Sequence, residues 1–390
     1  MHGAPAPSHS VRARPPPVLP QVLFFPAAAL YAATILPWSV LSMTGVVAGP
    51  AALSSGSGHA HEMLLGYALA VVAGHQLPPR PLPRVLMLFG SWALARVAFI
   101  AWPGGAASIL DAVFIALLGW QVAPRLFRAA KKLRNQALPG VLAALCAAAV
   151  AYEAAAAVAA TANVRAIMDA LVLLLAALML FMGGRIIAPA AAGQFYRQGR
   201  SLAARVQPRI EGWLMVTMTA AVLAAVVPPL APAMRAACAA AAALALVRLL
   251  RWRLWHCRRR PDLLCLGAGY GWLVLGLAAI AASGPGAGRS AALHVVTVGA
   301  LGTLTFNVMA AAMLRRARRD PADEPLLAWG TVAIGIATLA RVAAAPVPAL
   351  QAEWLAVAAT LWTGAFLALS WLIASCLLTA RCRRTAGAEP

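Results

Sequence analysis

The sequence predicts an all-α polytopic membrane protein with about twelve transmembrane helices and both termini in the cytoplasm. Three observations predict this fold class: an apolar composition, a series of apolar blocks long enough to cross a bilayer, and a one-sided distribution of basic residues. Of the 390 residues, 62% are hydrophobic and only 11% are charged. A soluble globular chain has about 45–50% apolar and about 25% charged residues. The composition therefore excludes the soluble class.

Twelve apolar blocks, separated by Gly, Pro or charged residues, each come close to the roughly 20 residues that a helix needs to cross the hydrocarbon core. In chain order they are 22–48, 59–77, 84–102, 106–124, 138–160, 166–189, 212–229, 231–250, 262–282, 290–314, 326–345 and 350–380. The first block is too long and too weakly terminated for a cleaved signal peptide, so we expect a retained helix. We assign 21–380 to a single transmembrane domain, with cytoplasmic tails at 1–20, which is Pro-rich, and 381–390.

The basic residues test the number of blocks, because an error of one helix would reverse the side of every later loop. All but six of the 32 Lys and Arg residues fall in runs that these spans place on one face. The runs lie at 12–14, 80–84, 125–134, 197–209, 248–260, 315–319 and 381–384. Loops on the other face, such as 102–108 and 282–288, are short and nearly uncharged. Because cytoplasmic loops carry an excess of Lys and Arg, the basic face and both termini are predicted to be cytoplasmic.

The formal net charge of +21 does not indicate nucleic-acid binding, because the basic residues form short runs between apolar blocks. Such runs are a topology signal and attract anionic lipid head groups, so the lipid bilayer is the predicted partner and nucleic acid is not. The six cysteines include no Cys-X-X-Cys pair and give no disulfide framework. The sequence contains no Walker motif, so it gives no support for ATP-driven transport.

Ionisable residues inside the predicted spans are few, and at membrane depth such residues indicate function by default. In chain order they are His59, His61, Glu62, His75, Arg96, Asp111, Glu153, Asp169, Arg185, His294 and Glu353. The first three belong to the stretch "GHAHEMLLGY" (58–67), where two histidines and a glutamate begin an apolar helix. The predicted topology brings His59, His61 and His294 to the same outer membrane face, although they are far apart in the chain.

These three histidines form the candidate site. Imidazole suits haem iron and copper, and it binds them as the neutral ring. Residues two apart on a helix point about 200° from each other, so His59 and His61 can share one metal only if His59 lies in the loop or the first turn. Each histidine alone could instead be an interfacial side chain bonded to a carbonyl or to water. For His59, His61 and His294 together we favour metal or haem ligation.

Three further residues are assigned to the candidate site. Glu62 could ligate copper, orient a histidine, or favour the positive N-terminus of its helix. His75 follows His61 by fourteen residues, which returns to nearly the same helix face about 20 Å further along, and it is a second candidate metal ligand. Arg185 follows two glycines and could pair with a haem propionate or with Asp169, or it could snorkel to the cytoplasmic interface.

At these residues the chain resembles the NnrS family of haem- and copper-containing bacterial membrane proteins, which is linked to nitric oxide metabolism and resistance to nitrosative stress. The stretch "HAHEMLLGYALAVVAG" (59–74) is similar to the most specific motif of the family. The motifs "MGGRIIAP" (182–189), "LLRWRLW" (249–255) and "LHVVTVGALGTLTFNVM" (293–309) recur in the family's order. The resemblance covers most of the chain. It implies twelve spans in the bacterial inner membrane and His59, His61 and His294 as ligands of haem b or copper.

The chain departs from the family pattern in three places. Where the family continues after a helix glycine with Pro-Asn-Trp-Thr-Gly, this chain has "HQLPPRPLPR" (75–84). A Leu-His before a Gly-Tyr is replaced by "LGAGY" (266–270), and a Gly-His-Thr-Gly-Arg segment by "RRARR" (315–319). At least two family histidines are therefore missing. We predict a reduced site, with one haem or one copper at the outer face.

The leading functional hypothesis is an inner-membrane haem- or copper-binding protein of NnrS type. Its chemistry would be binding or redox handling of a small ligand such as nitric oxide, and the sequence leaves open whether it turns over a substrate. The alternative is a metal-free polytopic transporter or membrane scaffold, which the missing histidines and the retained spans favour. A respiratory-type redox enzyme would need more ligands than the sequence supplies. The oligomeric state also stays open.

Overall fold

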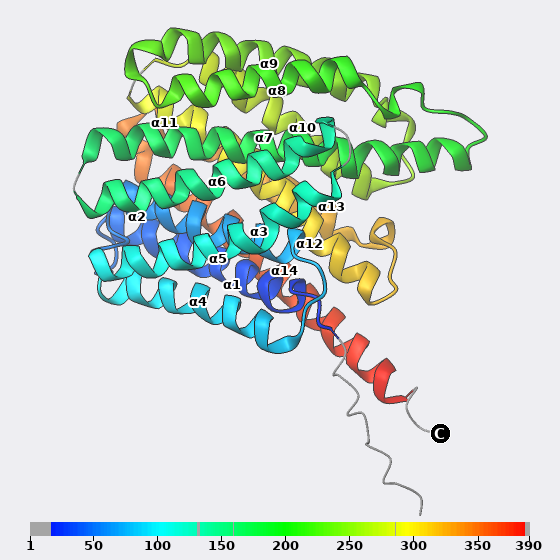
Figure 1. Ribbon diagram of the computed structural model, residues 1–390, viewed down its shortest axis with the longest axis horizontal. Coiled ribbons are helices and arrows are strands. Elements are labelled where there is room, and N and C mark those ends of the chain that lie inside the picture. The colour runs from blue at the N-terminus through cyan, green and yellow to red at the C-terminus, as the bar shows by residue number, and fades with distance from the viewer. Residues whose placement is uncertain (1–16, 131–132, 159, 285, 387–390) are drawn as a thin grey trace, which may run out of the picture.

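The computed structural model describes residues 17–130, 133–158, 160–284 and 286–386 (Figure 1). Within these ranges the chain is helical almost throughout, and one isolated bridge pairs Val18 with Arg80. The predicted all-α class is therefore confirmed. Residues 1–16 and 387–390, which belong to the predicted tails, lie outside the described residues.

The helices follow the predicted apolar blocks in chain order. They are α1 (Gln21–Met43), α2 (Gly56–His61), η1 (Glu62–Ala68), α3 (Leu69–Gln76), α4 (Leu82–Ala101), α5 (Gly105–Ala129), α6 (Leu133–Ala157), α7 (Thr161–Arg197), α8 (Pro208–Ala225), α9 (Ala231–Arg251), α10 (Pro261–Ala282), α11 (Ala287–His294), η5 (Val295–Gly302), α12 (Thr303–Arg316), α13 (Pro325–Ala343) and α14 (Gln351–Ala386). The segments η1 and η5 are π-helical. Each continues directly from one α-helix into the next, so 56–76 and 287–316 are two unbroken helices.

Ten helices in the described part of the chain are long and apolar enough to cross a membrane. The predicted span 59–77 forms the helix 56–76, and the predicted span 212–229 forms α8. Both helices are shorter or more polar than the other ten. The protein is therefore a multi-pass membrane protein. The count of twelve spans and the cytoplasmic position of the termini stay predictions.

The first helix ends earlier than the sequence predicts, at Met43 instead of residue 48. The cause is Gly45, whose φ of 74° lies in the left-handed region that glycine adopts without steric cost. The amide of Val46 donates to the carbonyl of Leu41 (3.0 Å), and the amide of Gly45 donates to that of Ser42 (3.3 Å). These two hydrogen bonds form a Schellman motif, which stops the helix.

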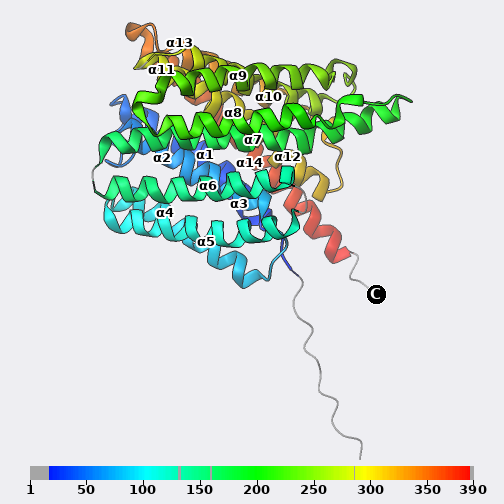
Figure 2. The same cartoon turned by 45° about the horizontal axis from the view of Figure 1, so that its top comes forward.

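Neighbouring helices pack side by side and run along one common direction (Figures 1 and 2). Contacts join α4 to α5, α5 to α6, α6 to α7, α7 to α8 and α8 to α9, while α1 packs against α14. The loops 44–55 and 102–104 and the end of α10 gather at one end, which we call the histidine end because α2 and α11 begin there. The Arg-rich loops 198–207, 252–260 and 317–324 gather at the other end, which we call the basic end (right in Figure 1).

Aromatic side chains hold the histidine-bearing helices against the core. The ring of Tyr67 in η1 makes edge contacts with Trp362 and Phe366 of α14. The hydroxyl of Tyr67 lies 2.5 Å from that of Thr305 in α12. The indole of Trp362 also donates to the carbonyl of Ala32 in α1, at 3.0 Å. These buried contacts fix η1 between α1, α12 and α14.

The outer surface is apolar. Trp120, Trp329 and Trp371, on α5, α13 and α14, are exposed by 72%, 72% and 78%. A water-facing surface rarely carries many large exposed apolar side chains in continuous patches. These residues therefore face lipid, in agreement with the multi-pass architecture.

Candidate functional site

His59 and His294 stand next to each other at the histidine end. Their ring centroids are 6.4 Å apart and the ring planes differ by only 15°. His59 lies in the first turn of α2, which Ser55 caps by accepting a hydrogen bond from the amide of Gly58 (3.1 Å). His294 is the last residue of α11. Both rings are half-buried. The structure thus brings together two predicted ligands from distant parts of the chain.

Hydrogen bonds orient both rings through Nδ1. His59 Nδ1 lies 2.7 Å from the hydroxyl of Ser39, and that hydroxyl donates its own proton to the carbonyl of Leu36 at 2.9 Å. His59 Nδ1 must therefore carry a proton and donate it to Ser39. His294 Nδ1 donates to the carbonyl of Ser290 at 2.7 Å. Each Nε2 then keeps a free lone pair, which is the arrangement of a metal-ligating histidine.

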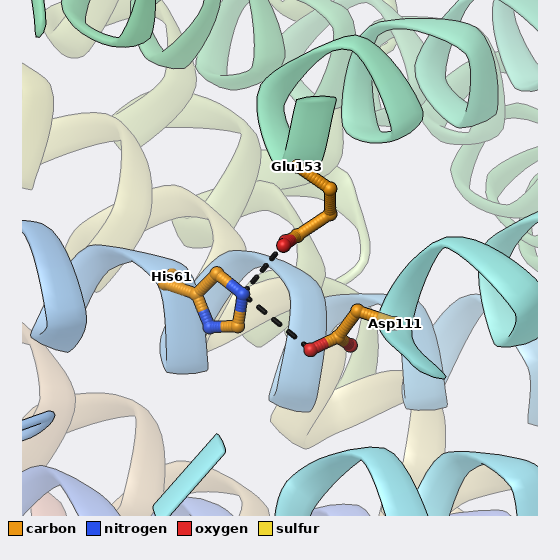
Figure 3. A group of neighbouring side chains, drawn as sticks. All are labelled: His61, Asp111 and Glu153. Carbon is orange, nitrogen blue, oxygen red and sulfur yellow. Dashed lines mark hydrogen bonds and ion pairs between the residues drawn. The ribbon is translucent and has the colours of Figure 1, made fainter. Parts of the chain in front are cut away.

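His61 does not join this pair. The first turn of α2 is already helical, so the side chains of His59 and His61 point in different directions. His61 Nε2 lies 2.7 Å from Glu153 Oε1 in α6 and 3.6 Å from Asp111 Oδ2 in α5 (Figure 3). Phe99 of α4 stacks on the imidazole, with centroids 3.8 Å apart and an interplanar angle of 8°. His61 therefore belongs to a second cluster, buried between four helices.

Glu62 and Arg96 complete this buried cluster. Glu62 Oε1 accepts hydrogen bonds from His61 Nδ1 (2.8 Å) and from Arg96 Nη1 (2.5 Å). Tyr31 donates its hydroxyl proton to the other oxygen of Glu62, and Arg96 forms an ion pair with Asp111. The side chains of His61, Glu62, Asp111 and Glu153 are at most 3% exposed. Of the roles that the sequence leaves open for Glu62, the structure supports the orientation of a histidine.

Both π-helical segments begin directly after a histidine. His61 is the last residue of α2 before η1, and His294 is the last residue of α11 before η5. A π-helical turn contains one residue more than an α-helical turn. It therefore changes the direction in which the preceding side chains point relative to the helix that follows. The predicted common face of His61 and His75 is lost for this reason. His61 points to α5 and α6, whereas His75 lines a cavity beside α7, α10 and α12.

Comparison with known proteins decides the family. The sequence model of the NnrS family, described as NnrS protein, matches residues 20–381. The chain belongs to the NnrS family. Among curated proteins no match to the chain is found. The predicted resemblance is thereby confirmed over nearly the whole chain.

Two of the NnrS-like motifs have a packing role in this chain. A Cβ at Gly183 of "MGGRIIAP" would lie 2.6 Å from the ring of Tyr270, and one at Gly184 would lie 2.0 Å from Arg248. Arg248, just before "LLRWRLW", donates to the carbonyl of Leu180 (2.8 Å) and pairs with Glu211 (2.9 Å). The two glycines therefore leave room for the side chains of Tyr270 and Arg248.

Arg185 lies away from the His59–His294 pair. It lines a cleft of about 770 Å³ with Glu211 and Arg248, in the half of α7 nearer the basic end. Its predicted partner Asp169 lies sixteen residues earlier on the same helix, about 24 Å away. Asp169 pairs instead with Arg289, at 2.9 Å. The structure therefore does not bring Arg185 to the histidine pair, and of the alternatives that the sequence leaves open for Arg185 it excludes the pair with Asp169.

His75 borders a small apolar cavity of about 90 Å³, which Met179, Met182 and Thr305 also line. Its Nδ1 is buried and has no hydrogen-bond partner among the described residues. Gln76 donates to the sulfur of Met182 at 3.7 Å. The predicted metal ligand His75 is thus far from the two clusters at the histidine end, and its role stays a prediction.

Sequence reasoning did not assign Arg96, Asp111 or Glu153 to the site, although it identified each as an ionisable residue inside a span. The positions of these residues in their helices could have indicated the cluster. The predicted topology places all three near the histidine end, Asp111 shortly after α5 begins, and Arg96 and Glu153 shortly before α4 and α6 end. His61, Asp111 and Glu153 offer three ligand atoms that lie within 4.8 Å of one another, so this group could hold a metal ion.

Proposed function

We propose that the protein is a bacterial inner-membrane haem- or copper-binding protein of NnrS type, which handles nitric oxide or a related small ligand. The observation that carries this proposal is the His59–His294 pair, with both Nδ1 atoms engaged in hydrogen bonds. The role in nitric oxide metabolism or in resistance to nitrosative stress rests on membership of the NnrS family.

The separation of the pair is short enough for both imidazoles to hold one ion. An imidazole nitrogen binds a first-row metal at about 2 Å. The observed centroid separation is 6.4 Å, and the ring planes are nearly parallel. Haem b iron and copper both accept this donor set. His59 and His294 would hold the ion, while Ser39 and the Ser290 carbonyl keep both rings in the ligating tautomer.

A bound haem iron or copper would supply a centre that binds small diatomic ligands and exchanges electrons. The residues of the chain would set its position and its access. Both rings are half-buried at the histidine end, where short loops separate them from the aqueous face. A small neutral molecule could therefore reach the centre from that face or from lipid.

Optical spectra and metal analysis of the purified protein test this proposal. After expression with haem and copper supplied, we expect the wild type to show a Soret band or about one copper per chain. His59→Ala and His294→Ala should both lose that signal. His256→Ala is the matched control, because His256 contacts Phe195 near the basic end and should not affect the metal. A wild type with neither haem nor copper would contradict the proposal and favour the metal-free transporter or scaffold.

A second variant tests the hydrogen bond of His59 without removing a ligand. Outer hydrogen bonds to a ligating histidine typically change metal affinity by about 10–100-fold. Ser39→Ala should weaken retention of the haem or copper by a factor in this range, measured by competition with a chelator or with free imidazole. Ser370→Ala is the control, because Ser370 bonds only to its own helix, at the Phe366 carbonyl (2.8 Å). Equal retention in both variants would contradict a role for Ser39.

A further inference from the structure

We propose that His61, Asp111 and Glu153 form a separate site for one divalent first-row metal ion such as Zn²⁺, Mn²⁺ or Fe²⁺. The three side chains come from α2, α5 and α6 and converge on one point (Figure 3). This site shares no ligand with the His59–His294 pair, and its donors are one nitrogen and two carboxylate oxygens. Such an ion would join α2 to α5 and α6 directly beside the turn that carries His59.

The two distances from His61 Nε2 are close to those between the ligand atoms of a bound metal ion. Ligand atoms that bind zinc tetrahedrally at about 2.0–2.1 Å lie about 3.3–3.4 Å from each other. His61 Nε2 and Asp111 Oδ2 are already 3.6 Å apart. His61 Nε2 and Glu153 Oε1 are 2.7 Å apart, so the glutamate must retreat by roughly 0.6 Å. Small changes in the torsions of the Glu153 side chain are sufficient for this movement.

Asp111 supplies the observation that points to a ligand. Its side chain is fully buried, and Oδ2 accepts no hydrogen bond from any of the described residues. The other oxygen belongs to the ion pair with Arg96. An ionised oxygen that is buried without a donor is costly, because it has lost water and gained no partner. Oδ2 points at His61 Nε2 (Figure 3), into the position that an ion would occupy.

The surrounding contacts are those of an oriented metal ligand. His61 Nδ1 faces Glu62 Oε1 at 2.8 Å, so Nε2 faces Asp111 and Glu153, where an ion would replace the proton of the hydrogen bond between Nε2 and Glu153 (2.7 Å). Glu62 is held by Arg96 and Tyr31, and the stacked ring of Phe99 fixes the plane of the imidazole. A carboxylate bonded to the far nitrogen of a ligating histidine is a common feature of metal sites.

The charges of the cluster also favour a cation. Of its three carboxylates, Glu62 and Asp111 contact the guanidinium of Arg96, whereas Glu153 contacts His61. When all three carboxylates are ionised and His61 is neutral, two negative charges stay uncompensated in a buried part of a membrane protein, which is expensive. One divalent ion brings the formal charge of the cluster to zero.

The donor set selects the class of metal. Thiolate ligands select copper(I), and no cysteine belongs to this group among the described residues. Magnesium and calcium prefer sites made of oxygen only, whereas imidazole with carboxylates suits zinc, manganese and iron(II). The donor set therefore differs from the two imidazoles proposed to hold haem or copper at the His59–His294 pair.

The experiment uses the full-length protein, purified in detergent, stripped with a chelator, loaded with Mn²⁺ or Zn²⁺ and desalted. Metal analysis should find one equivalent bound to the wild type. Asp111→Asn and Glu153→Gln should lower the retained metal at least tenfold. Asp169→Asn is the matched control, because it removes another carboxylate near the histidine end, from the pair with Arg289, and should retain one equivalent.

Two outcomes would overturn the proposal: no retained equivalent in the wild type, or equal retention in the wild type, Asp111→Asn and Glu153→Gln. The second outcome would mean that the metal is adventitious. A measurement on the Mn²⁺-loaded wild type needs no variant, so a variant that fails to fold does not decide the question. Pulsed electron paramagnetic resonance should detect one imidazole nitrogen coupled to the manganese, and its absence also overturns the site.

The Soret band and the copper content are recorded on the same samples. Glu153→Gln should leave both as in the wild type, because Glu153 does not contact the His59–His294 pair. Loss of Mn²⁺ with an unchanged haem or copper signal therefore supports the separate site. Failure of the haem or copper proposal leaves the manganese measurement valid, so the two proposals can fail independently.

Discussion

Gly66 lies where the side chains of Tyr31 and Arg96, which belong to the buried cluster, pack against the helix that carries His61. A Cβ at this position would lie 2.8 Å from the ring of Tyr31 and 3.2 Å from the Cδ and Nη1 atoms of Arg96. Tyr31 and Arg96 are the residues that hold Glu62. The absence of a side chain at Gly66 therefore allows the contacts that orient His61.

We predict that Gly66→Ala destabilises the protein by about 1–3 kcal/mol, the usual cost of overpacking a core. Tyr31 or Arg96 must move, so the variant should also retain less Mn²⁺. Thermal unfolding in detergent and metal analysis measure the two effects. Gly90→Ala on α4 is the control, because a Cβ there meets no atom within 4 Å. A Gly66→Ala protein as stable as Gly90→Ala would refute the argument.

At the scale of the element, the two π-helical segments determine where the histidines point. The extra residue in η5 sets the rotation of α11 relative to α12, and so the direction of His294. Gly299 and Gly302 in this segment lie against the rings of Trp272 and Trp362, and a Cβ would approach these rings to 3.0 and 2.5 Å. The close packing leaves η5 little freedom to relax into another register.

Deletion of Thr297 should convert η5 toward an ordinary α-helix. Because the α-helix covers the same rotation with one residue fewer, His294 should keep its direction relative to α12. We expect the deletion to preserve the haem or copper signal that His294→Ala loses, while the protein still purifies in one oligomeric state. Optical spectra and metal analysis measure the result.

Deletion of Gly284 is the control for this experiment. Gly284 lies in the loop before α11, so its loss shortens the connection without changing the helical register of His294. The signal should persist in that variant. Loss of the signal after deletion of Thr297, with the signal intact after deletion of Gly284, would contradict the argument that η5 absorbs one extra residue and so sets the direction of His294.

At the scale of the whole molecule, the Arg-rich loops collect at one end of the bundle and the histidines at the other (Figure 1). From the positive-inside rule we predict that the basic end faces the cytoplasm and that both candidate sites lie near the opposite face. The ends of α4, α5 and α6 that carry Arg96, Asp111 and Glu153 lie at this histidine end.

Reporter fusions test this orientation. Alkaline phosphatase, which is active only outside the cytoplasm, should be active when fused after Gly104, in the loop between α4 and α5. The same enzyme fused after Gly199 should be inactive, because that glycine lies beyond α7 at the basic end. A fluorescent protein at the C-terminus should fluoresce. The opposite pattern of phosphatase activity would reverse the predicted topology.

The sequence by itself determined the all-α class, the approximate helices and the family. Hydropathy and charge are properties of local stretches, so they can be read without knowing which helices are neighbours. The same reasoning predicted that His59 and His294 would reach one end of the bundle. It erred where local conformation intervened: Gly45 ends α1 early, and η1 separates the faces of His61 and His75.

Only the tertiary structure decided which polar groups meet. His59 pairs with His294, whereas His61, two residues later, joins Asp111 and Glu153. These choices depend on the rotation of each helix, which a single extra residue in a π-helical turn changes by about a quarter of a turn. Such a rotation leaves composition and mean hydropathy unchanged. It is set by the packing of all neighbouring helices together, and no local stretch of sequence contains it.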